Sequence, residues 1–457
     1  MSDRPTFLST PYGAYHHREV PTEDAELTHV GPGTPGGEYL RRFWQPVALS
    51  SELADLPLRV RALGEELVLF RDRGGRVGLL ELHCPHRGTS LEFGIVSERG
   101  LRCCYHSWLF DVDGRILETP GEPADSTLKD RLCHGAYPAL EYKGLVFAYM
   151  GPPELKPDFP YLDTYELPGN KMVPYCVSWP CNWLQAAENV MDPWHAVFLH
   201  TKISFVQFAD AWGAMPLIEW VETPLGMVYV TTRRWHDHIW VRSNDAILPN
   251  LNQVGAIWED GSQEKIFSRT GLTRWTLPVD DTHCMIIGWR HFHPSVDPHG
   301  KGDERRCGRE MVDFFGQDGN RPYEERQRIP EDYDAQVSQR PIAVHALEHL
   351  AATDRGVIMY RRSLRQEIRS VAAGRPPRPQ GKAGDLVPTY THDTVLRIPP
   401  LPGADDRAHV LEVGRRVTDI VIQGDCHTGD RRSTEIERRM RALAVDANGA
   451  RAQGQPA

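Results

Sequence analysis

The sequence predicts an α+β protein in which an all-β domain precedes a larger domain of strands and helices. Short apolar segments separated by glycine turns fill residues 38–152. Longer strand patterns then alternate with helical ones as far as about residue 373. A length of 457 residues also exceeds what one compact core usually supports. We therefore expect two domains, with additional segments at both ends.

Changes in composition divide the chain. Residues 1–37 are rich in Gly, Pro and Thr and are expected to form an N-terminal arm. Residues 38–152 form the predicted β domain, which a proline-rich linker, Pro152–Pro157, joins to the next domain. The second domain is predicted to span residues 158–400, and residues 401–457 form a C-terminal extension.

The β domain is predicted from alternation and turns. Leu58–Leu63 alternates apolar and polar residues, Gly64 turns the chain, and Leu67–Phe70 follows as a second strand. Arg73–Gly75 turns again into Val77–Leu80. Short strands joined by glycine turns are typical of a small antiparallel barrel or sandwich.

The second domain mixes helices and strands. Residues 182–200 are expected to be mostly helical, with Pro193 as a constraint, and residues 339–373 form a second helical pattern. Between them, strands are expected at Met227–Val230, His238–Val241 and Cys284–Trp289.

Composition excludes several classes of function. Lys and Arg number 52 and Asp and Glu 62, so the net charge is −10, and a nucleic-acid partner is not expected. No apolar run approaches the ~18 residues of a membrane span, and the segment Met1–Phe7 lacks a signal-peptide pattern. The nine cysteines are scattered and do not form a disulfide framework. We expect a cytoplasmic protein without a membrane partner.

Two of the cysteines lie beside histidines. Cys84 and His86 form C-x-H, and Cys103 and His106 form C-x-x-H. Cys104 is the competing thiol, but only Cys103 gives the second spacing, and Cys104 is expected to be a packed bystander. The two pairs could be unrelated, could bind zinc, or could hold a Rieske [2Fe-2S] cluster with two Cys on one iron and two His on the other.

The flanking residues favour the Rieske cluster. The loops read CPHRG and CYHSW, and FDVDG follows. Respiratory Rieske proteins carry two further cysteines that form a disulfide, whereas this chain has Thr89 and Tyr105 there. The sequence therefore resembles the low-potential type found in oxygenases and ferredoxins. It departs from that pattern at Ser107, where the family usually has Gly.

A second dense constellation lies in residues 182–200. His195 and His200 are five residues apart, which is about 140° on an ideal helix, so that binding one metal would need a π-bulge or a bend. Asp192 and His195 are three residues apart and share a face. Without other context, two such histidines are more often structural than ligating.

The arrangement D-x-x-H-x-x-x-x-H downstream of a Rieske motif resembles that of Rieske non-heme iron aromatic-ring-hydroxylating oxygenases, over roughly residues 38–370. The resemblance implies the α subunit of a terminal oxygenase, whose catalytic domain is a curved antiparallel sheet covered by helices. It implies Fe(II) in a 2-His-1-carboxylate triad that leaves positions open for O₂. His195 and His200 would be two of the three ligands.

The third ligand must be a carboxylate further downstream. The candidates are Asp332, Asp334, Glu348 and Asp354. The segment from Glu348 to Arg362 resembles the family's stretch that bears this aspartate, and the match falls on Asp354. Thr353 is expected to cap the helix that Asp354 begins. The alternative is that Asp354 only stabilises the helix dipole.

The resemblance gives Asp192 a separate role. It implies that this carboxylate bridges a cluster histidine of one subunit, His106, to an iron histidine of the neighbour, His195, and so carries electrons between them. That role requires an oligomer, and a homotrimer or hexamer is expected.

The implied reaction uses O₂ and electrons from a separate NAD(P)H-dependent reductase that carries flavin and iron–sulfur centres, with or without a ferredoxin. Asn182–Gln185 and Phe198–His200 resemble the phthalate dioxygenase group, which includes aryl O-demethylases such as the dehydrodivanillate enzyme. This group implies hydroxylation or O-demethylation of an aromatic, carboxylated substrate. The alternatives are cis-dihydroxylation of a phthalate-type substrate and a Rieske electron-transfer protein without catalysis.

A carboxylate substrate would need an Arg or a cluster of hydroxyl groups. The sequence does not single out one of its many arginines for this purpose. Six apolar residues lie in segments that could line the pocket, although most apolar residues there are expected to be core: Phe205, Phe208, Trp212, Leu248, Ile257 and Trp289.

Overall fold

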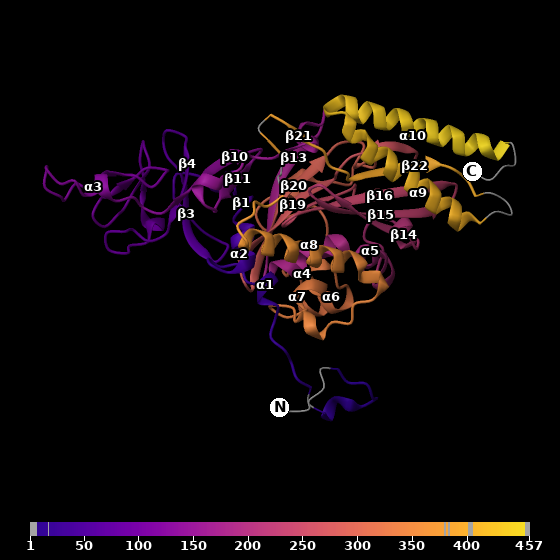
Figure 1. Cartoon of the computed structure of the whole chain (residues 1–457), viewed down its shortest axis with the longest axis horizontal. Coiled ribbons are helices and arrows are strands. Elements are labelled where there is room, and N and C mark those ends of the chain that lie inside the picture. Colours follow the sequence, from indigo (N-terminus) through magenta and orange to yellow (C-terminus); the bar gives the residue numbers. More distant parts are fainter. Residues whose placement is uncertain (1–6, 17, 379–380, 383, 401–404, 453–457) are drawn as a thin grey trace.

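The computed structural model describes residues 7–16, 18–378, 381–382, 384–400 and 405–452. Most of the N-terminal segment on which the targeting expectation rests, Met1–Thr6, lies outside them. The described chain is of the predicted α+β class, with antiparallel sheets and helices in two connected domains (Figure 1). None of the described helices combines the length and apolarity needed to cross a bilayer.

The N-terminal domain consists of three small antiparallel sheets with the orders β1-β11-β10, β2-β3-β4-β9 and β5-β6-β7-β8. The strands are β1 (Trp44–Leu49), β2 (Leu58–Ala62), β3 (Glu65–Arg71), β4 (Val77–Glu81), β5 (Ile95–Val96), β6 (Leu101–Arg102), β7 (Leu109–Phe110), β8 (Ile116–Glu118), β9 (Ala136–Tyr137), β10 (Ala139–Tyr142) and β11 (Leu145–Tyr149). A short helix, α3 (Leu128–Arg131), follows β8. Apolar residues of β3, β4, β6 and β7 form a core that also contains Cys84 and Cys103.

A nine-stranded sheet forms the centre of the second domain, and its pairs are antiparallel. The main path runs β13-β20-β19-β17-β16-β15-β14, and β22 pairs with both β16 and β18. The strands are β13 (Lys171–Trp179), β14 (Leu217–Thr223), β15 (Gly226–Trp235), β16 (His238–Ile247), β17 (Leu251–Val254), β18 (Lys265–Ser268), β19 (Leu272–Asp280), β20 (His283–Phe292) and β22 (His392–Arg397). A separate parallel pair joins β12 (Tyr161–Leu162) to β21 (Leu386–Val387).

Helices cover both faces of this sheet (Figure 1). On one face lie α4 (Trp183–Ala187), α5 (Pro193–Val197), α6 (Tyr323–Arg328), α7 (Asp332–Val337) and α8 (Arg355–Ala372). On the other lie α9 (Asp406–Gln423) and α10 (Gly429–Ala452). The alternation of a strand decides which residues face which layer, since successive side chains point to opposite sides. Val228 and Ile239 pack in the cluster beneath α9 and α10, whereas Tyr229 and Trp240 belong to the core on the α4 side.

The two domains share one continuous core and are joined by backbone hydrogen bonds. The amides of Leu63 and Gly64 donate to the carbonyls of Pro278 and Val279, at 2.8 and 2.9 Å. The indole of Trp289 donates to the carbonyl of Lys143 at 2.8 Å. These bonds fix the orientation of the β domain on the edge of the large sheet.

Two predicted segments differ from the structure. The helix expected over residues 339–373 begins only at Arg355, because Arg340 has a φ of 96° directly before Pro341 and short 3₁₀ turns follow. The second half of the expected N-terminal arm forms α1 (Ala25–Thr28) and α2 (Pro35–Leu40). Arg365 of α8 holds this part in place through its ion pair with Asp24.

The C-terminal helices are part of the fold of the second domain. Met440 of α10 is 0% exposed and packs in the cluster between the sheet and the helices. We expect Met440→Ala to lower the free energy of unfolding by about 2–5 kcal/mol, because it leaves a cavity in a packed core. Denaturant titration of the full chain measures this. Val445→Ala on the same helix is the control, since Val445 is 69% exposed and its change should be close to neutral. Equal effects of the two changes would contradict the docking of α10.

Candidate metal centres

Two loops of the β domain present the Cys–His pairs in the same backbone conformation. In the first, the amide of Gly88 donates to the carbonyl of Cys84 at 2.8 Å, and in the second that of Ser107 donates to Cys103 at 3.1 Å. Both loops turn through a positive φ at the donating residue, 73° at Gly88 and 61° at Ser107. The second loop therefore requires a left-handed residue where this chain has Ser.

The loops bring the four candidate ligands to one place. The rings of His86 and His106 lie 4.4 Å apart between centroids, on the outer side. Cys84 and Cys103 lie inside, 3% and 2% exposed. Burial raises the pKa of the Cys84 thiol to about 11, so the thiolate form needs a cation beside it. This donor set fits a metal centre bound by two thiolates and two imidazoles.

Two further side chains define the surroundings of these loops. Trp108 stacks on the ring of His86 at 4.7 Å between centroids and 4° between planes, which orients that imidazole. Cys104 is exposed and is therefore not the packed residue expected of a bystander.

The second constellation depends on a π-helix. His195 lies in α5, and His200 lies in the π-helix Phe198–Ile203 that follows directly. A π-helix pairs residues five apart, so the wider turn compensates for the 140° of an ideal α-helix. The two rings lie 5.2 Å apart between centroids. The sequence interpretation was that a shared metal would need a π-bulge or a bend, and the structure has a π-helix here.

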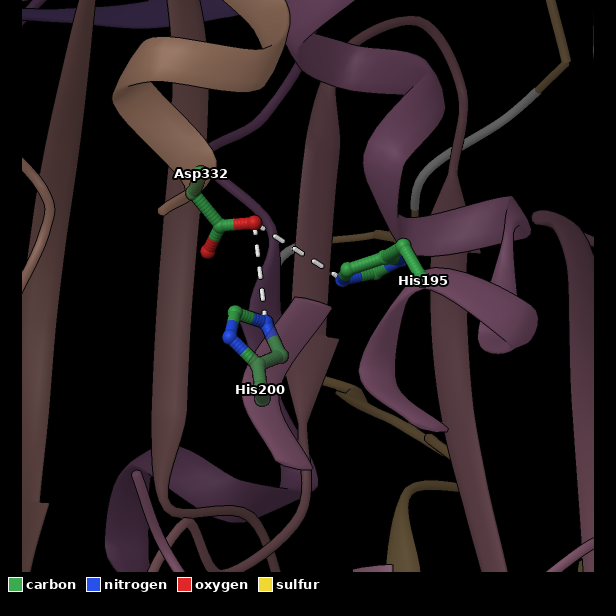
Figure 2. A group of neighbouring side chains, drawn as sticks. All are labelled: His195, His200 and Asp332. Carbon is green, nitrogen blue, oxygen red and sulfur yellow. Dashed lines mark ion pairs between the residues drawn. The ribbon is translucent and has the colours of Figure 1, made fainter. Parts of the chain in front are cut away.

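Asp332, the first residue of α7, meets the two histidines (Figure 2). Its Oδ1 atom lies 3.8 Å from Nε2 of His195 and 3.6 Å from Nε2 of His200. The three ligand atoms lie within 4.8 Å of one another. His200 and Asp332 are buried, and His195 is half-buried. Two imidazoles and one carboxylate that converge in this way are the donor set of a 2-His-1-carboxylate iron centre.

The structure thus brings Asp332, and not Asp354, to the histidines, which corrects the sequence prediction. Asp354 ends a short 3₁₀ turn before α8, where its Oδ2 accepts a hydrogen bond from the amide of Ala351 at 2.7 Å. This position directly before α8 is the one that the alternative interpretation, a carboxylate near the positive end of the helix dipole, assumes. The expected cap at Thr353 is not formed among the described contacts, because Asp354 itself occupies the N-cap position of α8 and Ala351 that of the preceding 3₁₀ turn.

The remaining candidates have other partners. Asp334 pairs with Arg321 and Arg326, each at 2.6 Å, and Glu348 pairs with Arg361. Both carboxylates are therefore held by guanidinium groups.

Hydrogen bonds orient both imidazoles toward Asp332. The Nδ1 atom of His195 bonds to the backbone carbonyl of Asp192, and Nδ1 of His200 lies 2.9 Å from Oε2 of Glu331. Each contact uses the ring nitrogen that faces away from the centre, which leaves Nε2 for a ligand bond. Glu331 is 0% exposed, and sequence reasoning missed it. Its position beside Asp332 after a proline is the only signal that could have found it.

Amide side chains surround the carboxylate. Gln317 donates to Oδ2 of Asp332 at 3.0 Å, and Asn189 donates to Oδ1 at 3.2 Å and lies 3.1 Å from Nε2 of His195. Burial by itself would raise the pKa of Asp332, but His200, His195 and Gln317 together lower it below its usual range. The carboxylate is thus held in the ionised form that binds a cation.

Asp192 lies between the candidate metal ligands and the surface. Its Oδ1 accepts from the amide of Trp194 at 3.1 Å, and its side chain is 36% exposed. It lines a cavity of about 520 Å³ that also reaches His195, Asp332 and Glu188. The centre is therefore accessible from outside on the side of Asp192.

Comparisons with known proteins identify the β domain and relatives of most of the chain. Residues 43–134 match the Rieske [2Fe-2S] domain. The oxygenase subunit of tert-butanol monooxygenase / tert-amyl alcohol desaturase from Aquincola tertiaricarbonis is 46% identical over 88% of this chain and 89% of its own. Phenoxybenzoate dioxygenase subunit alpha from Ectopseudomonas oleovorans is 39% identical over 80% and 89%, and the 5,5'-dehydrodivanillate O-demethylase oxygenase subunit from a Sphingobium strain is 31% identical over 82% and 87%.

A solved structure shares the fold. The crystal structure of dicamba monooxygenase bound to dicamba matches with a TM-score of 0.56 and 20% identity, over 74% of this chain and 99% of that one.

The chain therefore belongs to the Rieske non-heme iron oxygenases, as the terminal oxygenase subunit. It is an oxidoreductase whose cofactors are a [2Fe-2S] cluster and mononuclear iron. As the oxygenase component of a multicomponent system, it takes electrons from a reductase.

The strained loop residue gives a prediction about stability. A residue with a side chain is disfavoured in the left-handed region by about 1–2 kcal/mol. Replacing it by glycine recovers only part of this energy, because glycine also gives the unfolded chain more conformational freedom. We expect Ser107→Gly to stabilise the β domain by about 0.5–1 kcal/mol, measured as the temperature at which the visible spectrum of the cluster is lost.

The matched variant is Gly88→Ser in the first loop, where a Cβ would meet no described atom within 4 Å. The cost of Gly88→Ser therefore comes only from the left-handed backbone. This change should lower the stability of the β domain by an amount similar to the gain from Ser107→Gly. A loss of stability in Ser107→Gly, or a gain of stability in Gly88→Ser, would contradict the equivalence of the two loops.

Proposed function

We propose that the two loops hold the cluster and that the second group of side chains holds the iron. The cluster ligands are Cys84, His86, Cys103 and His106. The iron ligands are His195, His200 and Asp332. The observation that carries this proposal is the convergence of Asp332 with both Nε2 atoms, in the donor set that non-heme iron oxygenases use. When bound, such an iron supplies O₂ activation with electrons that reach it through the cluster.

The surrounding side chains position these ligands. Glu331 keeps the Nδ1 proton of His200 on the outer side, and the Asp192 carbonyl does the same for His195. Gln317 occupies the second oxygen of Asp332, which leaves Oδ1 toward the metal. Such outer contacts usually change metal affinity or activity by 10–100-fold.

We further propose that Asp192 carries electrons between subunits. The β domain lies at the left end of the molecule in Figure 1, and α5 lies well to the right of it, in the helical layer that also contains α4 and α8. A head-to-tail homotrimer would bring the exposed imidazole edge of a neighbouring β domain to the cavity that Asp192 lines. The electrons would come from an NAD(P)H-dependent flavin and iron–sulfur reductase in the cytoplasm.

For the substrate, we propose an aromatic carboxylate that is hydroxylated or O-demethylated. Two relatives that match over most of the chain act, by their names, on phenoxybenzoate and dehydrodivanillate. A tertiary alcohol is the second candidate, since the 46% identical relative is named for tert-butanol. Incubating the holoenzyme and a surrogate reductase with 3-phenoxybenzoate, methoxybenzoates and tert-butanol separates these candidates. The products and any released formaldehyde identify the reaction, and oxidation of none of them would contradict the proposal.

The ligand assignment predicts a difference between two aspartates. The wild type should contain about three irons and two sulfides per chain, one iron outside the cluster. Asp332→Asn should fall to about two irons with an unchanged Rieske spectrum, because the iron loses its only carboxylate. Asp354→Asn, the matched control, should keep all three. Iron loss in Asp354→Asn and not in Asp332→Asn would reverse the assignment.

The proposed bridge predicts a kinetic effect without loss of metal. We expect Asp192→Asn to slow oxidation of the reduced cluster by O₂ at least 10-fold, with iron content and oligomeric mass unchanged. Stopped-flow absorption of the cluster measures the oxidation rate, and mass photometry measures the oligomeric mass. An unchanged rate, or a monomeric wild type, would argue against transfer between subunits.

A further inference from the structure

Arg233 is a buried cation on the same face of the sheet as the iron centre. It lies on β15 directly opposite Trp240 of β16, and these two side chains share the face that packs toward α4 and α5. Arg233 is 3% exposed. Its Nε and Nη1 atoms have no hydrogen-bond partner among the described residues. A buried guanidinium with unused donors is unfavourable unless a ligand or a partner uses them.

A second arginine lies next to it. The Arg233 guanidinium stacks over the ring of Trp240 at 4.8 Å from the centroid, and that of Arg242 stacks over Trp212 at 4.4 Å. Nη1 of Arg242 donates to the carbonyl of Ala256 at 2.8 Å. Its Nη2 atom, like the two nitrogens of Arg233, has no acceptor within the described part of the chain.

The nearby carboxylates do not fully neutralise the charge of the two arginines. Asp393 lies 3.4 Å from Arg242, and its oxygens also accept from the Trp240 indole at 2.8 Å and the Ala256 amide at 2.7 Å. Glu259, also buried near Asp393, is paired with Lys265.

The local charge is therefore positive. Three cations and two carboxylates leave a net charge of 3 − 2 = +1 in this cluster. Burial, and then the charge of Arg242, lowers the pKa of Arg233 to about 10, which still leaves it protonated at neutral pH. One carboxylate would balance the charge and use the free donors.

An aromatic wall connects the arginines to the iron centre. The ring of His200 lies 5.2 Å from that of Phe208, and Phe208 lies 4.9 Å from Trp212, on which Arg242 stacks. The Trp212 indole is fixed by a 2.8 Å hydrogen bond to the carbonyl of Glu259. The order of these groups, a candidate metal centre, apolar rings and a cationic end, is the order that an aromatic carboxylate would require.

We infer that Arg233 and Arg242 form the carboxylate-binding subsite for the substrate of this oxygenase, with the substrate ring along Phe208 and Trp212. This inference rests on the proposed function and specifies its substrate as an aromatic monocarboxylate. The acid group lies at the arginines, so the end of the molecule remote from it faces the iron. Oxidation at a remote ether or ring position follows from this orientation. A small uncharged alcohol would leave the guanidinium donors unused.

The test compares a charged and an uncharged ligand of the same shape. We would titrate the full-length holoprotein with 3-phenoxybenzoate and with 3-phenoxybenzyl alcohol by calorimetry. The wild type should bind the acid at least 10-fold more tightly than the alcohol. Arg233→Met should weaken binding of the acid at least about 30-fold and leave that of the alcohol within about 3-fold. Arg233→Lys should retain part of the preference for the acid.

The matched control is Arg234→Met. Arg234 is the next residue, faces the other side of the strand, and pairs with Asp406 of α9. The Arg234→Met variant should bind both ligands as the wild type does. Equal binding of acid and alcohol by the wild type, or equal effects of the two substitutions on the acid, would overturn the inference.

Thermal melting separates ligand binding from a structural role. Since Arg233 carries an unpaired buried charge, Arg233→Met should melt no lower than the wild type, and 3-phenoxybenzoate should raise the melting temperature of the wild type but not that of Arg233→Met. A lower melting temperature for Arg233→Met without a loss of binding preference would make the residue structural. Oxidation of tert-butanol by an enzyme that does not bind the acid would overturn this subsite and leave the oxygenase function standing.

Discussion

The π-helix Phe198–Ile203 is the constraint on which the catalytic centre depends. An α-helix would turn His195 and His200 about 140° apart, and a single cation could not then reach both. The wider turn brings the rings to 5.2 Å and directs both Nε2 atoms at Oδ1 of Asp332. The non-helical backbone at Asp192, before Pro193, sets where this segment starts. The arrangement is then held from outside by Glu331 and Gln317.

The large sheet separates two environments. On the outer face, apolar residues meet α9 and α10, and the contacts there are those of a packed core. On the inner face, the same strands present Arg233, Arg242 and polar neighbours to the layer that carries the proposed iron ligands. Adjacent residues of one strand thus serve different purposes, because their side chains alternate between the faces. Arg233 and Arg234 illustrate this, the first a buried inner cation and the second an outer ion pair with Asp406.

The sequence predicted the family, the α+β class and the cofactors, because each depends on short motifs with fixed spacing. The loops at Cys84 and Cys103 are local hairpins, so their residues are close in sequence and in space. The need for a π-bulge between the two histidines was also predictable from their spacing alone. The third carboxylate was not predictable in this way. Asp332 lies 132 residues after His200, and four carboxylates in that region satisfied the same local criteria. The match to Asp354 selected a helix start that only stabilises its own turn.

What the sequence by itself determined is therefore the chemistry that lies within single segments: the donor types, their local geometry, and the order of the two centres along the chain. Only the tertiary structure decided which distant side chains meet. It selected Asp332 among the carboxylates and Glu331 as the partner of His200. It also placed two arginines with unused donors in the layer that faces the iron. The physical reason is that these contacts join segments far apart in the chain, and strand register and helix packing, which no local pattern encodes, set their distances.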